Sequence, residues 1–234
     1  MKRLAVVLAA SLLGTGCIVS DDCNTRTVSI GWPTFLLADG TQTASCGAAG
    51  VSSVDVFMDG QSVGNFACTE GGVSVTSVPD GTHVFTVEGL DGSSFIILRD
   101  EITLSATCGE QVVSVQPAEG TVELAYSFTP LNQCAADPSY LWFSIFDQVA
   151  GSVTVRIDEN SSTADKTRYT CPDPIVFAMP AGTFTFQSIE ERVLTAPGVY
   201  TVTGANCADG SFTVTGADLS TVDVALADAS AACP

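Results

Sequence analysis

Short runs of alternating apolar and polar residues recur along the chain after residue 17. In one of them Val54 and Val56 alternate with Ser53 and Asp55, and similar runs lie near residues 122, 184 and 222. Alternation of this kind, rich in β-branched and aromatic residues, is typical of half-buried β-strands. Gly, Pro, Asp and Asn separate the runs, and no stretch keeps a helical period for long. The pattern predicts an all-β protein.

The runs also form a tandem repeat. Residues 66–87, with Pro79-Asp80-Gly81, align with residues 169–187, with Pro180-Ala181-Gly182. Residues 106–124 align in the same way with 205–224, and each Pro-x-Gly step predicts a turn that closes a hairpin. A repeat of about 100 residues has the size of one immunoglobulin-like sandwich. We therefore predict two tandem immunoglobulin-like β-sandwiches, at 27–128 and 129–234, with the boundary where Thr129-Pro130 interrupts the strand pattern.

The N-terminus has the three-part layout of a secretory signal. Met1-Lys2-Arg3 is positively charged, Leu4 to Leu13 is apolar, and Gly14-Thr15-Gly16 supplies small residues before Cys17. The apolar run is too short to span a bilayer. We predict a signal peptide at residues 1–16, removed either with lipidation of Cys17 or by ordinary cleavage after Gly16.

The cysteine count favours lipidation. The chain has nine Cys, and if Cys17 carries a lipid, the eight that remain can close four disulfides in an oxidising compartment. Eight cysteines allow 105 connectivities, and we expect equivalent cysteines of the two repeats to pair equivalently. The resulting predicted pairs are Cys46–Cys68, Cys134–Cys171, Cys23–Cys108 and Cys207–Cys233. The absence of any C-x-x-C pair from the sequence argues against a zinc cluster.

The charge balance narrows the range of partners. The chain has 8 basic and 26 acidic residues and a net charge of −18. Nucleic-acid binding needs clustered Lys and Arg, so this class of partner is excluded. An acidic body without a polybasic patch is also repelled by anionic lipids. Contact with a membrane would therefore depend on acyl chains at Cys17, with residues 17–26 as a short tether.

Few residues could carry catalysis. His83 is the only histidine, which removes most metalloenzyme and Ser-His or Cys-His schemes, and we interpret it as a structural residue at a strand start. Acidic pairs occur at Asp100-Glu101, Asp158-Glu159 and Glu190-Glu191, but neighbours on a strand point to opposite faces. No EF-hand-type calcium loop is present, and we predict no catalytic residue, metal or cofactor.

The aromatic residues predict a core rather than a ligand platform. Residues 140–146 are apolar on both faces, as in a strand buried on both sides or lying between domains. Exposure of Tyr140 or Trp142 would instead offer a surface for a peptide or a sugar. Trp32 is likewise interpreted as a core residue.

Two segments resemble known families. The context of Cys17 resembles the lipobox of bacterial lipoproteins, with Gly14 where that family has a branched aliphatic residue and Leu13 one position earlier. In that family Ile18, rather than Asp, after the cysteine implies export to the outer membrane. Residues 46–60 and 78–81, with their following strand, resemble repeated β-sandwich domains of predicted lipoproteins from myxobacteria and related bacteria, which are similar to immunoglobulin-like and carboxypeptidase-regulatory-like domains.

Together these features predict a non-catalytic cell-envelope lipoprotein, held at the outer membrane or cell surface by its N-terminal lipid. We expect a structural module or a module that binds a protein or a glycan. Two alternatives remain open, an accessory hydrolase that uses acidic residues and a calcium-stabilised spacer.

Overall fold

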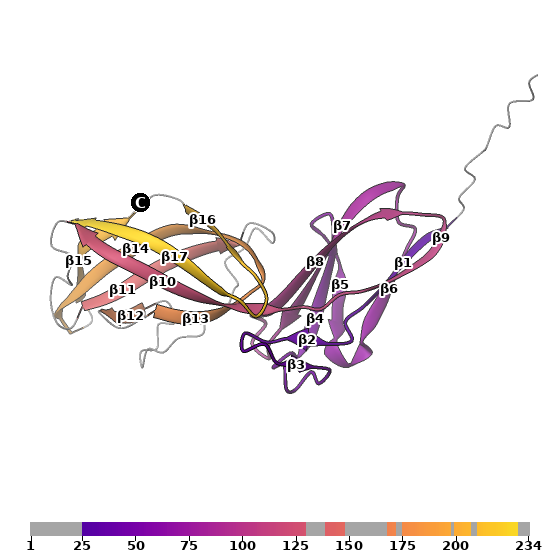
Figure 1. Cartoon of the computed structure of the whole chain (residues 1–234), viewed down its shortest axis with the longest axis horizontal. Coiled ribbons are helices and arrows are strands. Elements are labelled where there is room, and N and C mark those ends of the chain that lie inside the picture. Colours follow the sequence, from indigo (N-terminus) through magenta and orange to yellow (C-terminus); the bar gives the residue numbers. More distant parts are fainter. Residues whose placement is uncertain are drawn as a thin grey trace, which may run out of the picture.

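The computed structural model describes residues 25–129, 139–147, 168–171, 175–197, 199–206 and 210–228. Regular structure in this part of the chain is β-strand, apart from a single-turn 3-10 helix, η1 (Cys68–Glu70). The strands form an N-terminal unit (β1–β9) and a C-terminal unit (β10–β17), which Figure 1 shows as two lobes placed end to end. The predicted all-β class is confirmed.

The strands of the N-terminal unit are β1 (Arg26–Gly31), β2 (Phe35–Leu36), β3 (Gln42–Thr43), β4 (Ser53–Met58), β5 (Gln61–Ala67), β6 (Gly72–Thr76), β7 (Gly81–Leu90), β8 (Ile96–Ala106) and β9 (Gly109–Ser114). Those of the C-terminal unit are β10 (Glu119–Thr129), β11 (Ser139–Asp147), β12 (Arg168–Cys171), β13 (Ile175–Pro180), β14 (Gly182–Ala196), β15 (Val199–Asn206), β16 (Gly210–Val214) and β17 (Leu219–Asp228). Within the described residues, no helix is both long and apolar enough to cross a membrane.

The N-terminal unit is a sandwich of two sheets, with strand orders β6-β1-β9 and β5-β4-β7-β8. Val28 and Ile30 of β1 face Val54 and Val56 of β4 in one apolar core, and all four side chains are buried. Asp55, between the two β4 valines, points out of this core, as the alternation predicts. Burial of one such side chain is worth about 1.5–3 kcal/mol, so this shared layer holds the two sheets together.

The C-terminal unit repeats the strand pairing of the N-terminal unit. The order β5-β4-β7-β8 has its counterpart in β12-β11-β14-β15, and the pairs of β1 with β6 and β9 have counterparts in the pairs of β10 with β13 and β17. Both β1–β9 and β10–β17 are parallel pairs. The C-terminal strands form one continuous sheet, in which β16 pairs with β14. The tandem repeat in the sequence therefore corresponds to a repeated topology.

Strand β10 lies elsewhere than the repeat alignment implied. The repeat in the sequence predicts that residues 119–128 belong to the first sandwich and aligns 121–124 with 221–224. In the structure β10 is the first strand of the C-terminal unit and lies beside β17, with Leu124 opposite Val222. The link between the units is the short segment 115–118, which contains Pro117, rather than Thr129-Pro130. Two prolines interrupt the pattern here, and strand pairing decides between them.

The turns differ from the prediction in one respect. Pro79-Asp80-Gly81 and Pro180-Ala181-Gly182 do turn the chain, but each connects strands that belong to different pairs rather than closing a hairpin: β6 pairs with β1, whereas β7 pairs with β4 and β8. The Asp59-Gly60 turn does close the β4–β5 hairpin, and both of its residues have positive φ.

The predicted disulfide between Cys46 and Cys68 is present and joins the segment before β4 to η1 after β5. Cys108 is also disulfide-bonded, but its predicted partner Cys23 lies outside the described residues. The described residues also exclude Cys134, Cys207, Cys233 and the side chain of Cys171. The pairings of Cys23 with Cys108, Cys134 with Cys171 and Cys207 with Cys233 therefore stay predictions. The same holds for the signal peptide at 1–16 and for Cys17.

Candidate functional site

His83 is a structural residue of β7, as the sequence indicates. Its buried ring lies with Nδ1 2.7 Å from Asp59 Oδ2 and Nε2 3.1 Å from the Pro79 carbonyl oxygen. Both partners only accept hydrogen bonds, so the arrangement favours the doubly protonated ring. The Asp59 carboxylate, assisted by Pro79, raises the pKa of His83, and its hydrogen bonds to His83 and Val84 lower the pKa of Asp59. Both ring nitrogens are therefore engaged in contacts within the fold.

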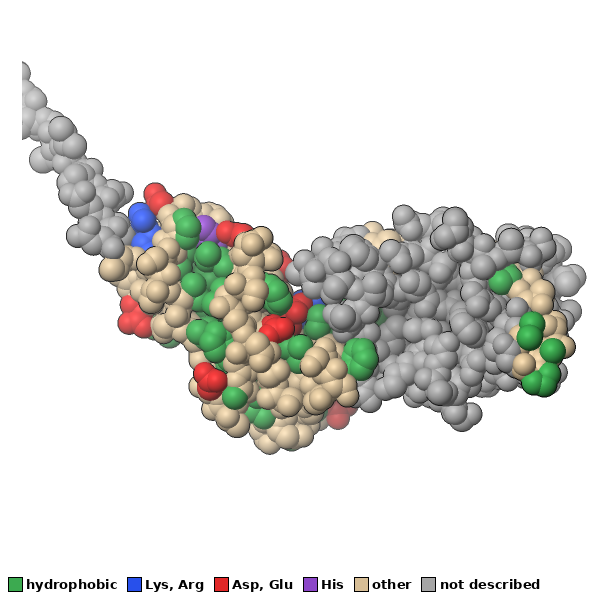
Figure 2. Space-filling model, turned by 180° about the vertical axis from the view of Figure 1, so that it is seen from behind, with side chains coloured by type: hydrophobic (Ala, Val, Ile, Leu, Met, Phe, Trp, Pro, Cys, Tyr) green, Lys and Arg blue, Asp and Glu red, His purple; other side chains and the backbone are tan. Residues whose placement is uncertain are grey.

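The acidic pairs give no convergent catalytic constellation in the part that the structure describes. The Asp100 carboxylate accepts hydrogen bonds from the backbone N–H groups of Glu101 and Gln116, and so ties β8 to the segment leading into the second unit. Asp158-Glu159 lies outside the described residues, as do the side chains of Glu190-Glu191 on β14. Figure 2 shows acidic side chains spread singly over one face of the N-terminal unit, and no group of three or more potential metal ligands occurs among the described residues.

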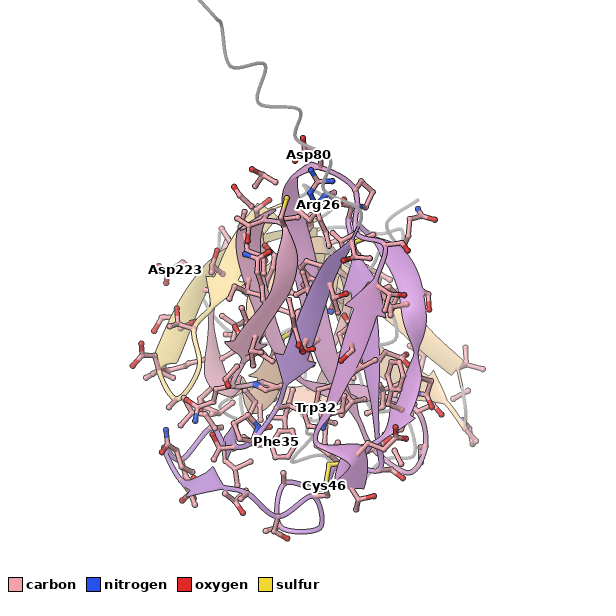
Figure 3. The ribbon with its side chains drawn as sticks, turned by 90° about the vertical axis from the view of Figure 1, so that its right-hand side faces the viewer. Arg26, Trp32, Phe35, Cys46, Asp80 and Asp223 are labelled. Atoms are coloured by element: carbon pink, nitrogen blue, oxygen red, sulfur yellow. A yellow bond between two sulfur atoms is a disulfide. The ribbon has the colours of Figure 1, made fainter. Side chains whose placement is uncertain are left out.

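A shallow concavity of about 470 Å³ lies at one end of the N-terminal unit. Its floor includes Trp32 and Phe35, which Figure 3 shows with Cys46 at the opposite end of the unit from Arg26 and Asp80. Trp32 is buried, as predicted, and its indole N–H donates to the Cys68 carbonyl oxygen at 3.0 Å. The described residues that line the concavity include no charged side chain. The side chains of Tyr140 and Trp142 lie outside the described part.

The most unusual chemistry lies where the two units meet. Glu88 of β7 and Arg99 of β8 are directly opposite each other, and both are about 2% exposed. Arg99 Nη2 and Nε lie 2.6 and 2.9 Å from Glu88 Oε1. Alternation puts both residues on the outer face of their sheet, since their neighbours Val87 and Leu98 belong to the core. Glu101, further along β8 on that face, is exposed. The C-terminal unit therefore covers this part of the face.

Arg99 contacts the C-terminal unit through its side chain. Its guanidinium carbon lies 5.7 Å from the ring centre of Phe184 in β14, within cation–π range. Gly182, at the start of β14, leaves room for the guanidinium, because a Cβ there would lie 2.9 Å from Nη1. Gly182 also has a positive φ, a backbone conformation that favours glycine over any other residue. One buried cation thus contacts a carboxylate of one unit and an aromatic ring of the other.

Backbone hydrogen bonds reinforce this junction. Arg99 and Ala118 exchange both N–H···O bonds, at 3.0 and 2.9 Å, and the Ala118 carbonyl also accepts from the N–H of Ala181. Residues of β8, the inter-unit link and the turn before β14 are therefore bonded through Ala118. A second contact lies nearby, where the Glu119 carboxylate accepts from the N–H of Ala38. Rotation of one unit against the other would break these bonds and expose the ion pair.

Sequence patterns alone did not identify Glu88 and Arg99 as site residues. The available signal was a charged residue next to apolar ones, with Glu88 inside the mainly apolar run from Phe85 to Leu90 and Arg99 directly after Ile96 to Leu98. A charge in a buried strand needs a partner, and only a few basic residues are available to the many acidic ones. Gly182 was recognised as a turn glycine, but its role beside Arg99 depends on a contact between distant parts of the chain.

No protein-family model and no curated protein matches the sequence. Among solved structures, a minor pilin of Streptococcus agalactiae is similar over 88% of this chain and 98% of its own, with 11% identity and a TM-score of 0.40. A putative cell adhesion protein of Bacteroides thetaiotaomicron is similar over 85% of this chain and 92% of its own (13% identity, TM-score 0.29). A leucine-rich repeat protein of the same organism aligns over 87% of this chain but only 27% of its own (15% identity, TM-score 0.29). At these scores the likeness carries no argument about function, which has to come from the molecule itself.

Proposed function

We propose that this protein is a non-catalytic cell-envelope lipoprotein whose two rigidly joined β-sandwich units act as a structural and binding module. The observation that carries the proposal is the junction built on Glu88 and Arg99. Domains linked through an ordinary polar interface move relative to each other. In this protein, movement of one unit relative to the other would expose the buried Glu88–Arg99 ion pair and break the hydrogen bonds at Ala118. The two units therefore behave as one rod.

The chemistry of the candidate residues supports a role without catalysis. Both ring nitrogens of His83 lie within hydrogen-bond distance of acceptors of the fold, and Asp100 uses both carboxylate oxygens as acceptors. Neither group is free to move a proton to or from a substrate. Rigidity, rather than reactivity, is the property for which the buried polar groups are arranged.

Anchoring at Cys17 supports placement on the envelope. The predicted signal peptide, the lipobox-like context and the even number of remaining cysteines agree with one another. A rigid body on a short tether would hold its far loops at a defined distance from the outer membrane. The uncharged concavity over Trp32 and Phe35 would then offer a site for a neutral glycan or a peptide backbone.

Two measurements test the proposal. Cells that express the full chain are labelled with radioactive palmitate, and we expect label and membrane association in the wild type but not in Cys17→Ser. The exported Cys17→Ser chain is then studied by small-angle X-ray scattering, which should fit one fixed arrangement of the units, whereas Arg99→Ala should broaden the distribution of shapes. Unlabelled wild type would contradict the anchor. Wild-type scattering that requires freely rotating units would contradict the rigid module.

A further inference from the structure

Strand β9 forms one edge of the three-stranded sheet β6-β1-β9. Among the described residues it pairs only with β1, in a parallel register without irregularity. Figure 1 shows β9 running from the end of the N-terminal unit that lies away from the C-terminal unit back toward the link between the units. Among the described residues, no strand of either unit pairs with the opposite long edge of β9.

The free edge of β9 has a regular set of hydrogen-bonding groups. The N–H of Gly109 donates to Thr25 and that of Val115 donates to Gly31, so alternate residues of β9 face β1, as in any parallel ladder. The residues between them, Glu110, Val112 and Ser114, direct their N–H and C=O groups away from β1. An added strand could pair with all of them.

This edge lacks the features by which proteins usually protect an exposed strand. Residues 109–114 contain no proline, lysine or bulge. The only charged side chain of β9 is that of Glu110. It lies over the sheet, because its Oε1 accepts a hydrogen bond from the Ser29 hydroxyl at 2.7 Å. Val112 lies at the centre of the strand and is 76% exposed, more than the other exposed large apolar side chains of the described residues.

We propose that β9 pairs with β9 of a second copy of this chain. An antiparallel pair centred on Val112 puts this residue opposite the partner's Val112, and Glu110 opposite the partner's Ser114. The arrangement is self-complementary, since it joins two exposed valines and opposes each carboxylate to a hydroxyl. A pair centred on Glu110 would instead bring two carboxylates together in a chain that is already strongly acidic. In this pairing the three-stranded sheets of the two copies join into one continuous sheet.

The register is tested by cross-linking, in the full chain carrying Cys17→Ser so that no other unpaired cysteine is expected. In an antiparallel hydrogen-bonded pair, opposed Cα atoms lie about 5.5 Å apart, within disulfide range. Val112→Cys should therefore give a disulfide-linked dimer on a non-reducing gel. Ser114→Cys is the matched control and should stay monomeric, because its partner across the axis is Glu110. Equal linking of both variants, or of neither, would overturn the proposed register.

Self-association is measured by analytical ultracentrifugation over a range of concentrations. We expect a reversible dimer, weakened roughly tenfold or more by Val112→Lys. Val112→Pro should act similarly, since it removes an outward N–H and leaves the ladder with β1 intact. Val176→Lys, at a 41% exposed position on β13, should leave the dimer unchanged. A wild type that stays monomeric, or a dimer insensitive to both Val112 variants, would refute the proposal. These outcomes do not depend on lipidation or on the junction at Arg99.

Discussion

Replacement of Arg99 by alanine is the most informative perturbation of the junction. The change leaves the Glu88 carboxylate, which is about 2% exposed, without its cation in a site that water does not reach. Removal of one partner of a buried ion pair typically costs about 3–5 kcal/mol. The cost is a large share of the 5–15 kcal/mol that stabilises a typical domain, so Arg99→Ala should lower the free energy of unfolding by an amount that urea titration resolves easily.

The double variant separates the cost of an unpaired charge from the value of the pair. Replacement of a buried pair by apolar residues of similar size is often neutral or stabilising, so Glu88→Leu with Arg99→Met should recover most of the loss. Asp80→Ala is the control, because it breaks the ion pair between Asp80 and Arg26, in which the Asp80 side chain is 79% exposed. An exposed ion pair of this kind contributes at most about 1 kcal/mol to stability.

All three variants are compared with their Cys17→Ser parent by urea unfolding, followed by fluorescence and circular dichroism. Two results would refute the reasoning. One is an Arg99→Ala variant as stable as the Asp80→Ala control. The other is a double variant no more stable than Arg99→Ala, which would mean that lost packing, rather than an uncompensated charge, sets the cost.

Three further predictions concern single residues. The ring of His83 should titrate in NMR with a pKa above its ordinary value of about 6.5. The contribution of the protonated ring to stability is then complete below pH 6.5 and is lost as the pH rises through the higher pKa of the folded state. A pKa at or below 6.5 in the folded protein would contradict this prediction. Gly182→Ala should destabilise the protein more than Gly81→Ala in thermal unfolding, because both glycines have positive φ but only the Cβ at 182 meets Arg99; equal losses would show that the contact is unimportant. Trp32→Phe should cost about 1–3 kcal/mol in urea unfolding by leaving a buried carbonyl without its donor, and a change below the error of the titration would contradict that role.

Local patterns predicted the elements of this fold well. Alternation identified the inward positions Val54 and Val56, because it depends on residues that are neighbours in the chain. The repeat of Pro-x-Gly also matched β7 with β14 correctly. These features are decided by the direction of side chains along a strand and by the steric limits on φ.

Features that depend on distant pairing were harder to predict. Both β10 and β17 have the same alternating pattern as many other strands, so nothing local says that they lie side by side. The parallel pairing of β1 with β9 raises the same difficulty. The candidate site is the clearest case, because the role of Arg99 depends on its contacts with Glu88, Ala118 and Phe184, and only the folded chain brings these residues together.

The central claim is that the two units form one rigid body. Residual dipolar couplings of backbone amides, measured by NMR on the Cys17→Ser chain in a dilute aligning medium, test it most directly. A single alignment tensor should fit the couplings of both units in the orientation of Figure 1. Separate tensors for the N-terminal and C-terminal units, with smaller couplings in one of them, would contradict the claim.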